Sequence, residues 1–195
     1  MSRARIGSGL GALILLGFAV VVAVSHSTPP TPSVPRITAP SNAAVVAGTR
    51  AQPSPVQDLE GPFQVTRVVD GDTIHVRAGA RDVTVRLIGI NTPETVAPGR
   101  PVECFGPQAS AEAHRLLDGR SVYLERDSSQ DAVDRYGRTL AYVWISGTDL
   151  FNLDMVQGGF AKEYTYRTPY HHRDDFIAAQ DAAVAEGAGL WAACQ

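Results

Sequence analysis

Acidic residues are absent from the first 57 positions of this chain, and their absence limits which part of it can fold. All 20 Asp and Glu residues lie at or after Asp58, and the stretches before it are either apolar or rich in Pro. Neither stretch mixes polar and apolar residues in the way that builds a soluble core. We therefore predict one folded domain over residues 58–195, a usual length for a single domain.

Residues 1–25 have the pattern of an export segment. Arg3 and Arg5 precede an uncharged apolar run, residues 6–24, and small residues around Ala23 and Ser25 suit cleavage by a signal peptidase. The run is also close to the length that spans a bilayer, with two Arg placed to hold its start in the cytoplasm. A cleaved signal peptide and a retained membrane tether both remain open. Either one predicts that the rest of the chain is secreted or membrane-anchored, outside the cytoplasm.

Residues 26–57 are rich in Pro, Ser, Thr and Ala, and carry almost no charge and no aromatic side chain. Such a segment cannot bury enough apolar surface to offset the entropy lost on ordering it. We expect a flexible linker with some polyproline character.

The domain begins with three short runs rich in β-branched residues. They are Val65–Val69, Ile74–Ala78 and Val83–Ile90, and the turn residues Asp70-Gly71 and Gly79 separate them. This pattern predicts a three-stranded meander. Side chains alternate along a strand, so Arg86 should project from an ordered surface opposite Val85 and Leu87.

The remainder predicts helices and two further strands. A helix should begin at Pro107 and end before Gly119, and glycines also follow the two later helices. The predicted helices are Pro107–Leu117, Leu150–Gln157 and Asp174–Glu186, and the predicted strands are Ser121–Glu125 and Leu140–Ile145. The fold class is therefore α+β, a small barrel of about five strands with about three helices packed on it.

The domain is net acidic. It carries 13 Arg and Lys residues against 20 Asp and Glu, a formal charge of −7. Such a domain has no broad attraction for polyanions, so any binding of phosphate must be local and metal-assisted. All but one of its basic residues are Arg, and the exception is Lys162.

Cys104 and Cys194 are the two cysteines of the chain. An isolated pair in an exported domain forms a disulfide more often than a metal site, which would need more ligands at closer spacing. We predict a disulfide that ties the end of the chain to the middle of the domain. Two unpaired thiols are the alternative.

Chemically active side chains concentrate in three motifs: V-V-D-G-D-T-I at 68–74, R-L-I-G-I-N-T-P-E-T at 86–95 and D-R-Y-G-R at 134–138. The planar forks of Arg86 and Arg138 match pairs of phosphate oxygens. Carboxylate, amide and carbonyl oxygens, as at Asp72, Asn91 and Thr92, suit Ca²⁺ better than zinc. These residue types together favour phosphodiester hydrolysis assisted by a divalent cation.

Each residue also has a plainer interpretation. Asp70-Gly71-Asp72 is an ordinary hairpin turn, and the two arginines are ordinary partners for surface carboxylates. His171-His172, shortly before two acids, predicts an exposed helix start with no catalytic role. For Tyr170 we expect a half-buried packing role. The joint presence of Asp72, Arg86, Glu94 and Arg138 is what these interpretations explain poorly.

In the order and spacing of its motifs the sequence resembles the staphylococcal nuclease, or thermonuclease, family over about Phe63 to Trp191. The shared elements are the D-G-D turn, T-P-E, the G-P-x-A-S helix start at 106–110, Y-G-R, and G-L-W at 189–191. The resemblance implies an OB-type barrel. It also implies a hydrolase acting on ester bonds, a Ca²⁺-dependent nuclease that cuts DNA and RNA and leaves 3′-phosphate products.

The resemblance further implies a metal site. Asp72 and Asn91 would bind Ca²⁺ through their side chains and Thr92 through its backbone carbonyl, with Asp70 in support. The family pattern has Asp where this chain has Asn91. An amide oxygen still binds Ca²⁺, but the loss of one negative charge should weaken the affinity.

For catalysis the resemblance implies that Glu94 positions or deprotonates the attacking water, while Arg86 and Arg138 hold the phosphate and stabilise its developing charge. Tyr164 and Tyr166 would lie against the terminal nucleotide, where stacking tolerates any base. No obligate protein partner is predicted. The alternative function is a non-catalytic module at the cell surface that binds nucleic acid or protein, because barrels of this kind also exist without catalytic residues.

Overall fold

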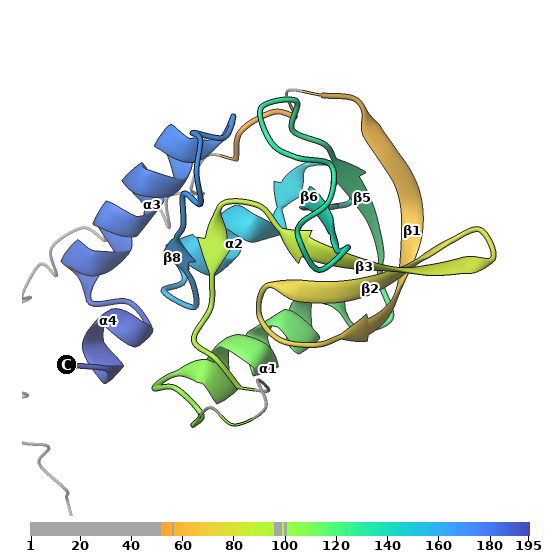
Figure 1. Ribbon diagram of the computed structural model, residues 1–195. Helices are drawn as coiled ribbons and strands as arrows, with labels where there is room; N and C mark the ends of the chain where they lie inside the picture. Colours follow the sequence, from red (N-terminus) through yellow and green to blue (C-terminus); the bar gives the residue numbers. More distant parts are fainter. Residues whose placement is uncertain (1–51, 56, 96–98, 100) are drawn as a thin grey trace, which may run out of the picture. The chain divides into compact units, whose positions relative to one another are not determined.

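The computed structural model describes residues 52–55, 57–95, 99 and 101–195 (Figure 1). The predicted export segment at 1–25 and most of the predicted linker at 26–57 lie outside the described residues. Within the described ranges, no helix combines the length and the apolar character needed to cross a membrane.

Five strands close into a barrel, as predicted. They are β1 (Leu59–Val68), β2 (Thr73–Ala78), β3 (Arg81–Leu87), β5 (Ser121–Glu125) and β6 (Thr139–Ile145). β1, β2 and β3 form the predicted antiparallel meander, and β5 pairs antiparallel with both β1 and β6. Parallel pairing of β3 with β6 joins the two ends of this sheet and closes the barrel.

The alternation predicted for the third strand is confirmed. Val85 and Leu87 are buried in the barrel, and Arg86 between them lies partly exposed on the outer side. The strand itself ends earlier than predicted, because Gly89 adopts a positive φ of 80°. A side chain at this glycine would also collide with the Tyr170 ring. Beyond it, β4 (Ile90–Asn91) pairs with β8 (Lys162–Glu163) in a separate two-stranded sheet.

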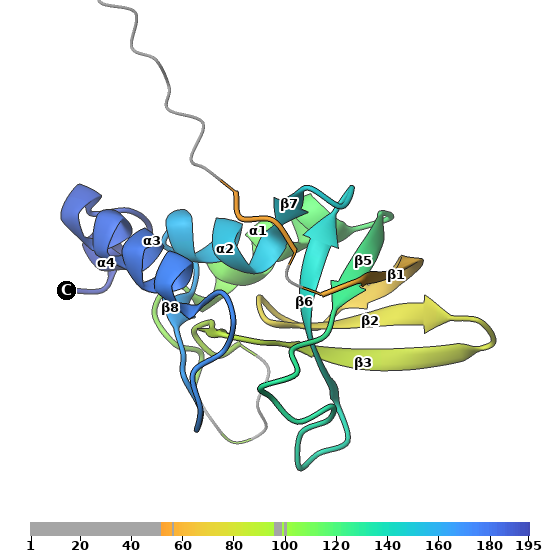
Figure 2. The same cartoon turned by 90° about the horizontal axis from the view of Figure 1, so that it is seen from above.

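The helices gather on one side of the barrel (Figure 2). The predicted helices are confirmed as α1 (Gly106–Leu117), α2 (Phe151–Gln157) and α3 (Arg173–Glu186), with a short strand β7 (Asp149–Leu150) before α2. A fourth helix, α4 (Leu190–Ala193), was not predicted. It has only four residues, too few to show helical periodicity in the sequence.

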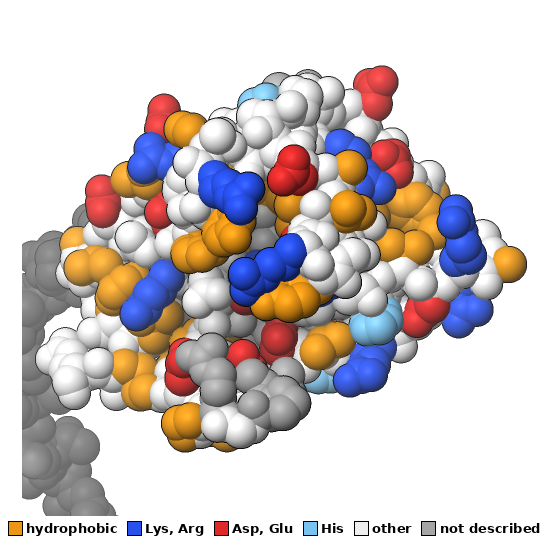
Figure 3. All heavy atoms as spheres, viewed as in Figure 1, with side chains coloured by type: hydrophobic (Ala, Val, Ile, Leu, Met, Phe, Trp, Pro, Cys, Tyr) orange, Lys and Arg blue, Asp and Glu red, His pale blue; other side chains and the backbone are white. Residues whose placement is uncertain are grey.

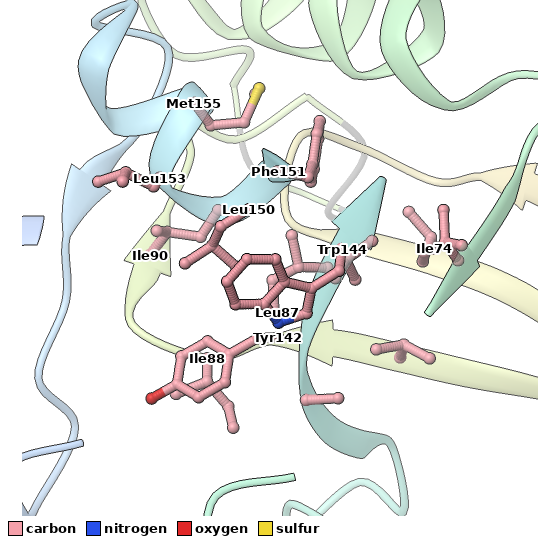
Figure 4. Close-up of a cluster of buried hydrophobic side chains, with 14 of the residues drawn as sticks. Ile74, Leu87, Ile88, Ile90, Tyr142, Trp144, Leu150, Phe151, Leu153 and Met155 are labelled. Carbon is pink, nitrogen blue, oxygen red and sulfur yellow. The ribbon is translucent and has the colours of Figure 1, made fainter. Parts of the chain in front are cut away.

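The core lies between the barrel and α2 (Figure 4). Its largest side chains are fully buried, among them Trp144 and Tyr142 of β6 and Phe151 of α2. Phe176 of α3 packs edge-on against the Tyr142 ring, with 6.3 Å between ring centroids. This core fixes β6, and through the β3–β6 pairing it also fixes the strand that carries Arg86.

A buried ionic network joins the core to the start of α3. The Glu125 carboxylate accepts hydrogen bonds from the Trp144 indole N–H (2.8 Å) and the Gln57 backbone N–H (2.9 Å), and it lies 3.1 Å from His172 Nε2. The prediction of an exposed histidine pair is therefore wrong for His172, whose side chain is 2% exposed. Its partner Glu125 lies 47 residues away in the sequence, so no local pattern could reveal the pairing.

Asp127 organises the loop after β5. It accepts hydrogen bonds from the Tyr142 hydroxyl (2.6 Å), the His171 backbone N–H (2.8 Å) and the Ser129 backbone N–H (2.8 Å). Burial alone would raise the pKa of the Asp127 carboxyl, but these hydrogen bonds outweigh it and hold the pKa below its usual value.

This depressed pKa predicts acid-dependent stability. A carboxyl whose pKa is lowered by folding stabilises the protein above the unfolded pKa, near 3.9, and loses that contribution as the pH falls through its folded pKa. Asp127→Asn places an amide among hydrogen-bond donors, so we expect about 2 kcal/mol of destabilisation at pH 7. In urea unfolding, the difference between variant and wild type should shrink below about pH 4. A difference that stays constant with pH would contradict this role.

The predicted disulfide between Cys104 and Cys194 is present, with 5.8 Å between the two Cα atoms. It joins the segment before α1 to the residue that follows α4. Contacts with the domain also begin before the predicted boundary at Asp58. The Gln52 side chain donates to Asp154 (2.7 Å) and accepts from the Leu150 backbone N–H (2.9 Å).

Candidate active site

A cleft of about 800 Å³ opens at one side of the barrel. Its walls come from β3, β4, the loop between β5 and β6, and the segment that follows β8. Five of the predicted site residues line it: Arg86, Asn91, Arg138, Tyr164 and Tyr166. Figure 3 shows Lys and Arg side chains spread over one face of the molecule, with Asp and Glu among them. Four arginines line the cleft, so it holds the cationic groups that a net-acidic domain needs for local phosphate binding: Arg86, Arg135, Arg138 and Arg167.

Arg86 is fixed in the cleft wall by contacts to three of its guanidinium nitrogens. Nη1 donates to the backbone carbonyls of Leu87 (2.7 Å) and Ile90 (2.9 Å). Nε lies 3.2 Å from Asp72 Oδ1, and Nη2 donates to Asn91 Oδ1 at 3.3 Å. The side chain is 14% exposed, so it reaches the cleft from an anchored position. A guanidinium held in this way is preorganised to bind an anion.

Asp72 lies at the start of β2 and joins it to the chain that follows β4. Its Oδ2 accepts hydrogen bonds from the Thr92 backbone N–H (2.9 Å) and the Thr92 hydroxyl (3.1 Å). No larger residue fits in place of Gly71, because its Cβ would lie 2.5 Å from the Thr92 methyl group. The plainer interpretation of D-G-D as a turn is therefore confirmed, and its role in a metal site stays a prediction.

Negative charge concentrates around this turn. The pKa of the Asp70 carboxyl is raised to about 6, first by burial and then by the charge of Asp72, and Glu94 adds a smaller effect in the same direction. Asp70 Oδ1 also accepts the backbone N–H of Asp72 at 3.0 Å. Carboxylates that destabilise one another in this way are stabilised by a nearby cation.

The donor set fits a hard cation. Asp72 and Asn91 are both in contact with Arg86, and Thr92 is hydrogen-bonded to Asp72, so the three predicted ligands lie together. They offer only oxygen atoms, the type that Ca²⁺ prefers. Among the described residues, no group of three or more His, Cys, Asp or Glu side chains has a metal-binding arrangement. A site of this kind must therefore draw on the Asn91 amide and on the backbone.

Arg138 is the second arginine of the cleft and is held by a carboxylate of its own. Its Nε and Nη2 contact Asp134 Oδ2 at 2.7 and 2.6 Å. Burial tends to raise the pKa of Asp134, but hydrogen bonds from the Arg138 backbone and side chain and from the Tyr136 N–H keep it below its usual value. Asp134 therefore stays ionised at neutral pH and orients the guanidinium. The structure thus agrees in part with the plainer interpretation of both arginines, because each has a carboxylate partner.

Glu94 follows Asn91 and Thr92 at the end of the T-P-E motif and is half-buried. Its carboxylate accepts the Thr95 backbone N–H at 2.8 Å. Its effect on the pKa of Asp70 places it within electrostatic reach of the acidic turn. Asp70, Asp72, Thr92 and Glu94 are absent from the lining of the cleft. Asp72 connects to it through its contact with Arg86, and Thr92 is hydrogen-bonded to Asp72.

Four tyrosines line the cleft, and three of them are exposed. Tyr164 and Tyr166 are 45% and 59% exposed, with 6.3 Å between ring centroids. Tyr136 is 68% exposed and contacts the guanidinium groups of Arg135 and Arg138. No role was predicted for this residue of the Y-G-R motif. Its position between Arg135 and Arg138 in the sequence could have indicated a role in binding nucleic acid. Tyr170, expected to be half-buried, is buried at 5% exposure and donates to the Gly89 carbonyl (3.2 Å).

Comparison with known proteins identifies the family. Residues 84–193 match the family model described as "Staphylococcal nuclease homologue". The chain is 40% identical to a thermonuclease of Staphylococcus hyicus over 132 residues, which is 68% of this chain and 76% of that protein. It is also 40% identical to a thermonuclease of Staphylococcus intermedius over 135 residues, 69% of this chain and 79% of that protein.

A more distant relative is the endonuclease YncB of Bacillus subtilis (strain 168), 32% identical over 125 residues, 64% of this chain and 59% of that protein. These matches confirm the resemblance inferred from the motifs. The chain belongs to the staphylococcal nuclease family.

Proposed function

We propose that this nuclease is a Ca²⁺-dependent phosphodiesterase that acts on both DNA and RNA outside the cytoplasm and leaves 3′-phosphate products. The observation that carries the proposal is the placement of Arg86, which reaches the cleft while its Nε contacts the buried carboxylate of Asp72 at 3.2 Å. One side chain thereby couples the cleft to the group of predicted metal ligands.

Arg86 and Arg138 bind the scissile phosphate. Negative charge on the non-bridging phosphate oxygens must be stabilised as water attacks, and fixed guanidinium groups supply that stabilisation without reorganising. Asp72 and Asp134 hold the two side chains in place before the substrate arrives. When Ca²⁺ is bound by Asp72, Asn91 and Thr92, it supplies further positive charge beside the phosphate.

Glu94 is the general base. It accepts a proton from the attacking water, the new bond forms between the water oxygen and phosphorus, and the bond from phosphorus to the 5′ oxygen breaks. The departing 5′ oxygen takes a proton from solvent, which leaves a 5′ hydroxyl on one product and a 3′ phosphate on the other. The Thr95 backbone N–H donates to Glu94 Oε1 at 2.8 Å and so helps to orient the carboxylate.

Tyr136, Tyr164 and Tyr166 supply flat surfaces on which bases stack. Every base has an aromatic face, so stacking binds single strands with little regard to sequence or sugar. This is the basis for proposing both DNA and RNA as substrates. The catalytic constellation of Arg86, Glu94 and Arg138 argues against the binding-module alternative.

The location outside the cytoplasm rests on the export pattern of residues 1–25 and on the Cys104–Cys194 disulfide, since disulfides persist in oxidising compartments. Intact cells expressing the chain should degrade nucleic acid added to the medium, or release that activity into it. Activity that appears only after lysis would contradict this location.

The function is tested by analysing the products of the full chain. Single-stranded DNA and RNA oligonucleotides are incubated with enzyme in Ca²⁺ or in chelator, and the product ends are identified by treatment with phosphatase and kinase. We expect cleavage of both substrates in Ca²⁺, with 3′-phosphate and 5′-hydroxyl ends. Undiminished cleavage in chelator, or 5′-phosphate ends, would overturn the proposal. Arg81→Ala, at the exposed start of the strand that carries Arg86, should cut both substrates as the wild type does, because Arg81 does not line the cleft.

Asn91→Asp should strengthen calcium activation. The substitution restores a charged ligand, and calcium affinity rises with ligand charge, so we expect the Ca²⁺ concentration for half-maximal rate to fall about tenfold. Asn91→Ala, which removes the ligand oxygen, should shift it in the opposite direction. The measurement is the initial rate against Ca²⁺ concentration at saturating substrate. If both variants keep the wild-type midpoint, Asn91 is not a ligand.

A further inference from the structure

The backbone of Glu94 is held on both sides by one other residue. The Glu94 N–H donates to the Glu103 carboxylate oxygen Oε2 at 3.1 Å. In return, the Glu103 N–H donates to the Glu94 carbonyl at 2.8 Å. Both peptide groups of Glu94 are therefore fixed by a residue nine positions later in the chain, one turn before α1.

The start of α1 supports the same point of the backbone. An added Cβ at Gly106, the first residue of the helix, would lie 2.9 Å from the Glu94 carbonyl oxygen and 3.2 Å from that of Pro93. Only glycine permits this approach, and Gly106 is buried. Glu103 and Gly106 are thus packed directly against the backbone of Glu94, the residue that we assign as general base.

The disulfide ties this segment to the far end of the chain. Cys104, next to Glu103, is bonded to Cys194, which follows α4 (Figure 1). α4 is itself anchored, because Leu190 is buried and its N–H donates to the Gly159 carbonyl at 2.9 Å. Beside the disulfide, the Phe105 ring stacks on Phe160 with 5.7 Å between centroids. The support of Glu94 therefore extends through Glu103 and Cys104 into the helical side of the domain.

We propose that Glu103 is a positioning residue for Glu94 and that the Cys104–Cys194 disulfide holds Glu103 in place. The inference rests on the proposed function, because it takes Glu94 to be the general base. Glu103 is not among the residues that line the cleft. Its contribution should therefore appear in kcat and not in KM.

A general base contributes only when it lies within hydrogen-bond reach of the water it deprotonates, and a displacement of about 1 Å can cost about 100-fold in rate. Loss of the Glu103 side chain leaves the Glu94 N–H without that acceptor and removes one of the two hydrogen bonds between Glu94 and Glu103. We expect Glu103→Ala to lower kcat by about 10- to 100-fold, with KM within about twofold of wild type.

The test compares three variants of the full chain on single-stranded DNA at saturating Ca²⁺. Glu103→Gln keeps an oxygen that accepts the Glu94 N–H and should retain most of the wild-type kcat, while Glu103→Ala should not. Glu60→Ala removes an exposed carboxylate of β1 that pairs with Arg126 and does not line the cleft, so it should leave kcat and KM unchanged. Thermal unfolding of each variant establishes that it is folded at the assay temperature.

The disulfide is tested separately with Cys104→Ser combined with Cys194→Ser. This variant should lose kcat in the same direction as Glu103→Ala, and adding Glu103→Ala to it should cost less than the product of the two separate effects. If Glu103→Ala alone does not fold, the double serine variant still tests the support of Glu94, because it keeps the Glu103 side chain.

Three results would overturn the inference: a folded Glu103→Ala with wild-type kcat, equal losses in Glu103→Ala and Glu103→Gln, or fully multiplicative losses with the disulfide variant. Failure of the proposed function is recognised independently. In that case the wild type itself does not cut in Ca²⁺, or Glu94→Gln cuts as fast as the wild type.

Discussion

Glu94→Gln is expected to lower kcat about 1,000-fold, because general base catalysis contributes about 10²–10⁴ in rate and an amide cannot accept the proton. The substitution keeps the size of the side chain and leaves an oxygen to accept the Thr95 N–H, so the fold should be unaffected. KM should change little, since Arg86, Arg138 and the tyrosines bind the substrate. The measurement is steady-state cleavage of single-stranded DNA in Ca²⁺.

Glu112→Gln is the matched control. Glu112 is a glutamate of α1 that forms an ion pair with Arg115, and neither residue lines the cleft. It should retain wild-type kcat. A Glu94→Gln enzyme within about tenfold of wild type would show that another group accepts the proton, since this loss is smaller than the usual contribution of a general base.

Glu125→Ala is expected to have the largest effect on stability. It removes the partner of the His172 imidazole and of the Trp144 N–H in the interior, and breaking a buried pair costs about 3–5 kcal/mol. For a chain of this size, that corresponds to a fall of about 10 °C in Tm. The measurement is thermal unfolding followed by circular dichroism at pH 7.

Glu60→Ala again serves as the control, since its ion pair with Arg126 is exposed and should contribute less than about 1 kcal/mol. A Tm for Glu125→Ala equal to that of Glu60→Ala would contradict the account of the buried network. His172→Ala should also be destabilised, because it removes the imidazole that lies 3.1 Å from the buried Glu125 carboxylate.

Much of the fold could be predicted because its strands are short and regularly patterned. Alternation in β3 placed Val85 and Leu87 inside and Arg86 outside, and glycines marked the ends of the longer helices. Closure of the barrel could not be derived from pattern alone. It depends on parallel pairing of β3 with β6, which lie about fifty residues apart and carry no local sign of their contact.

The site was predictable to the extent that motif and resemblance marked it. The cleft brings Arg86, Asn91, Arg138, Tyr164 and Tyr166 together from four parts of the chain. The long-range contacts that hold Glu94 and His172 in place could not be predicted from the sequence. Glu103 holds Glu94 through its carboxylate and its backbone N–H, a pairing that no motif marks, and His172 finds its buried partner only in the folded state. The roles assigned to the site residues stay predictions until the variants are measured.

The central claim is that the cleft hydrolyses phosphodiester bonds with Ca²⁺ and Glu94. It is tested most directly by the rate at which the full chain cuts a fluorescent single-stranded DNA as Ca²⁺ is titrated, for the wild type and for Glu94→Gln. The account predicts that the wild-type rate rises from near zero in chelator to a plateau, and that Glu94→Gln stays about 1,000-fold lower at every concentration. Wild-type cleavage that is independent of Ca²⁺, or a Glu94→Gln enzyme that reaches the same plateau, would contradict it.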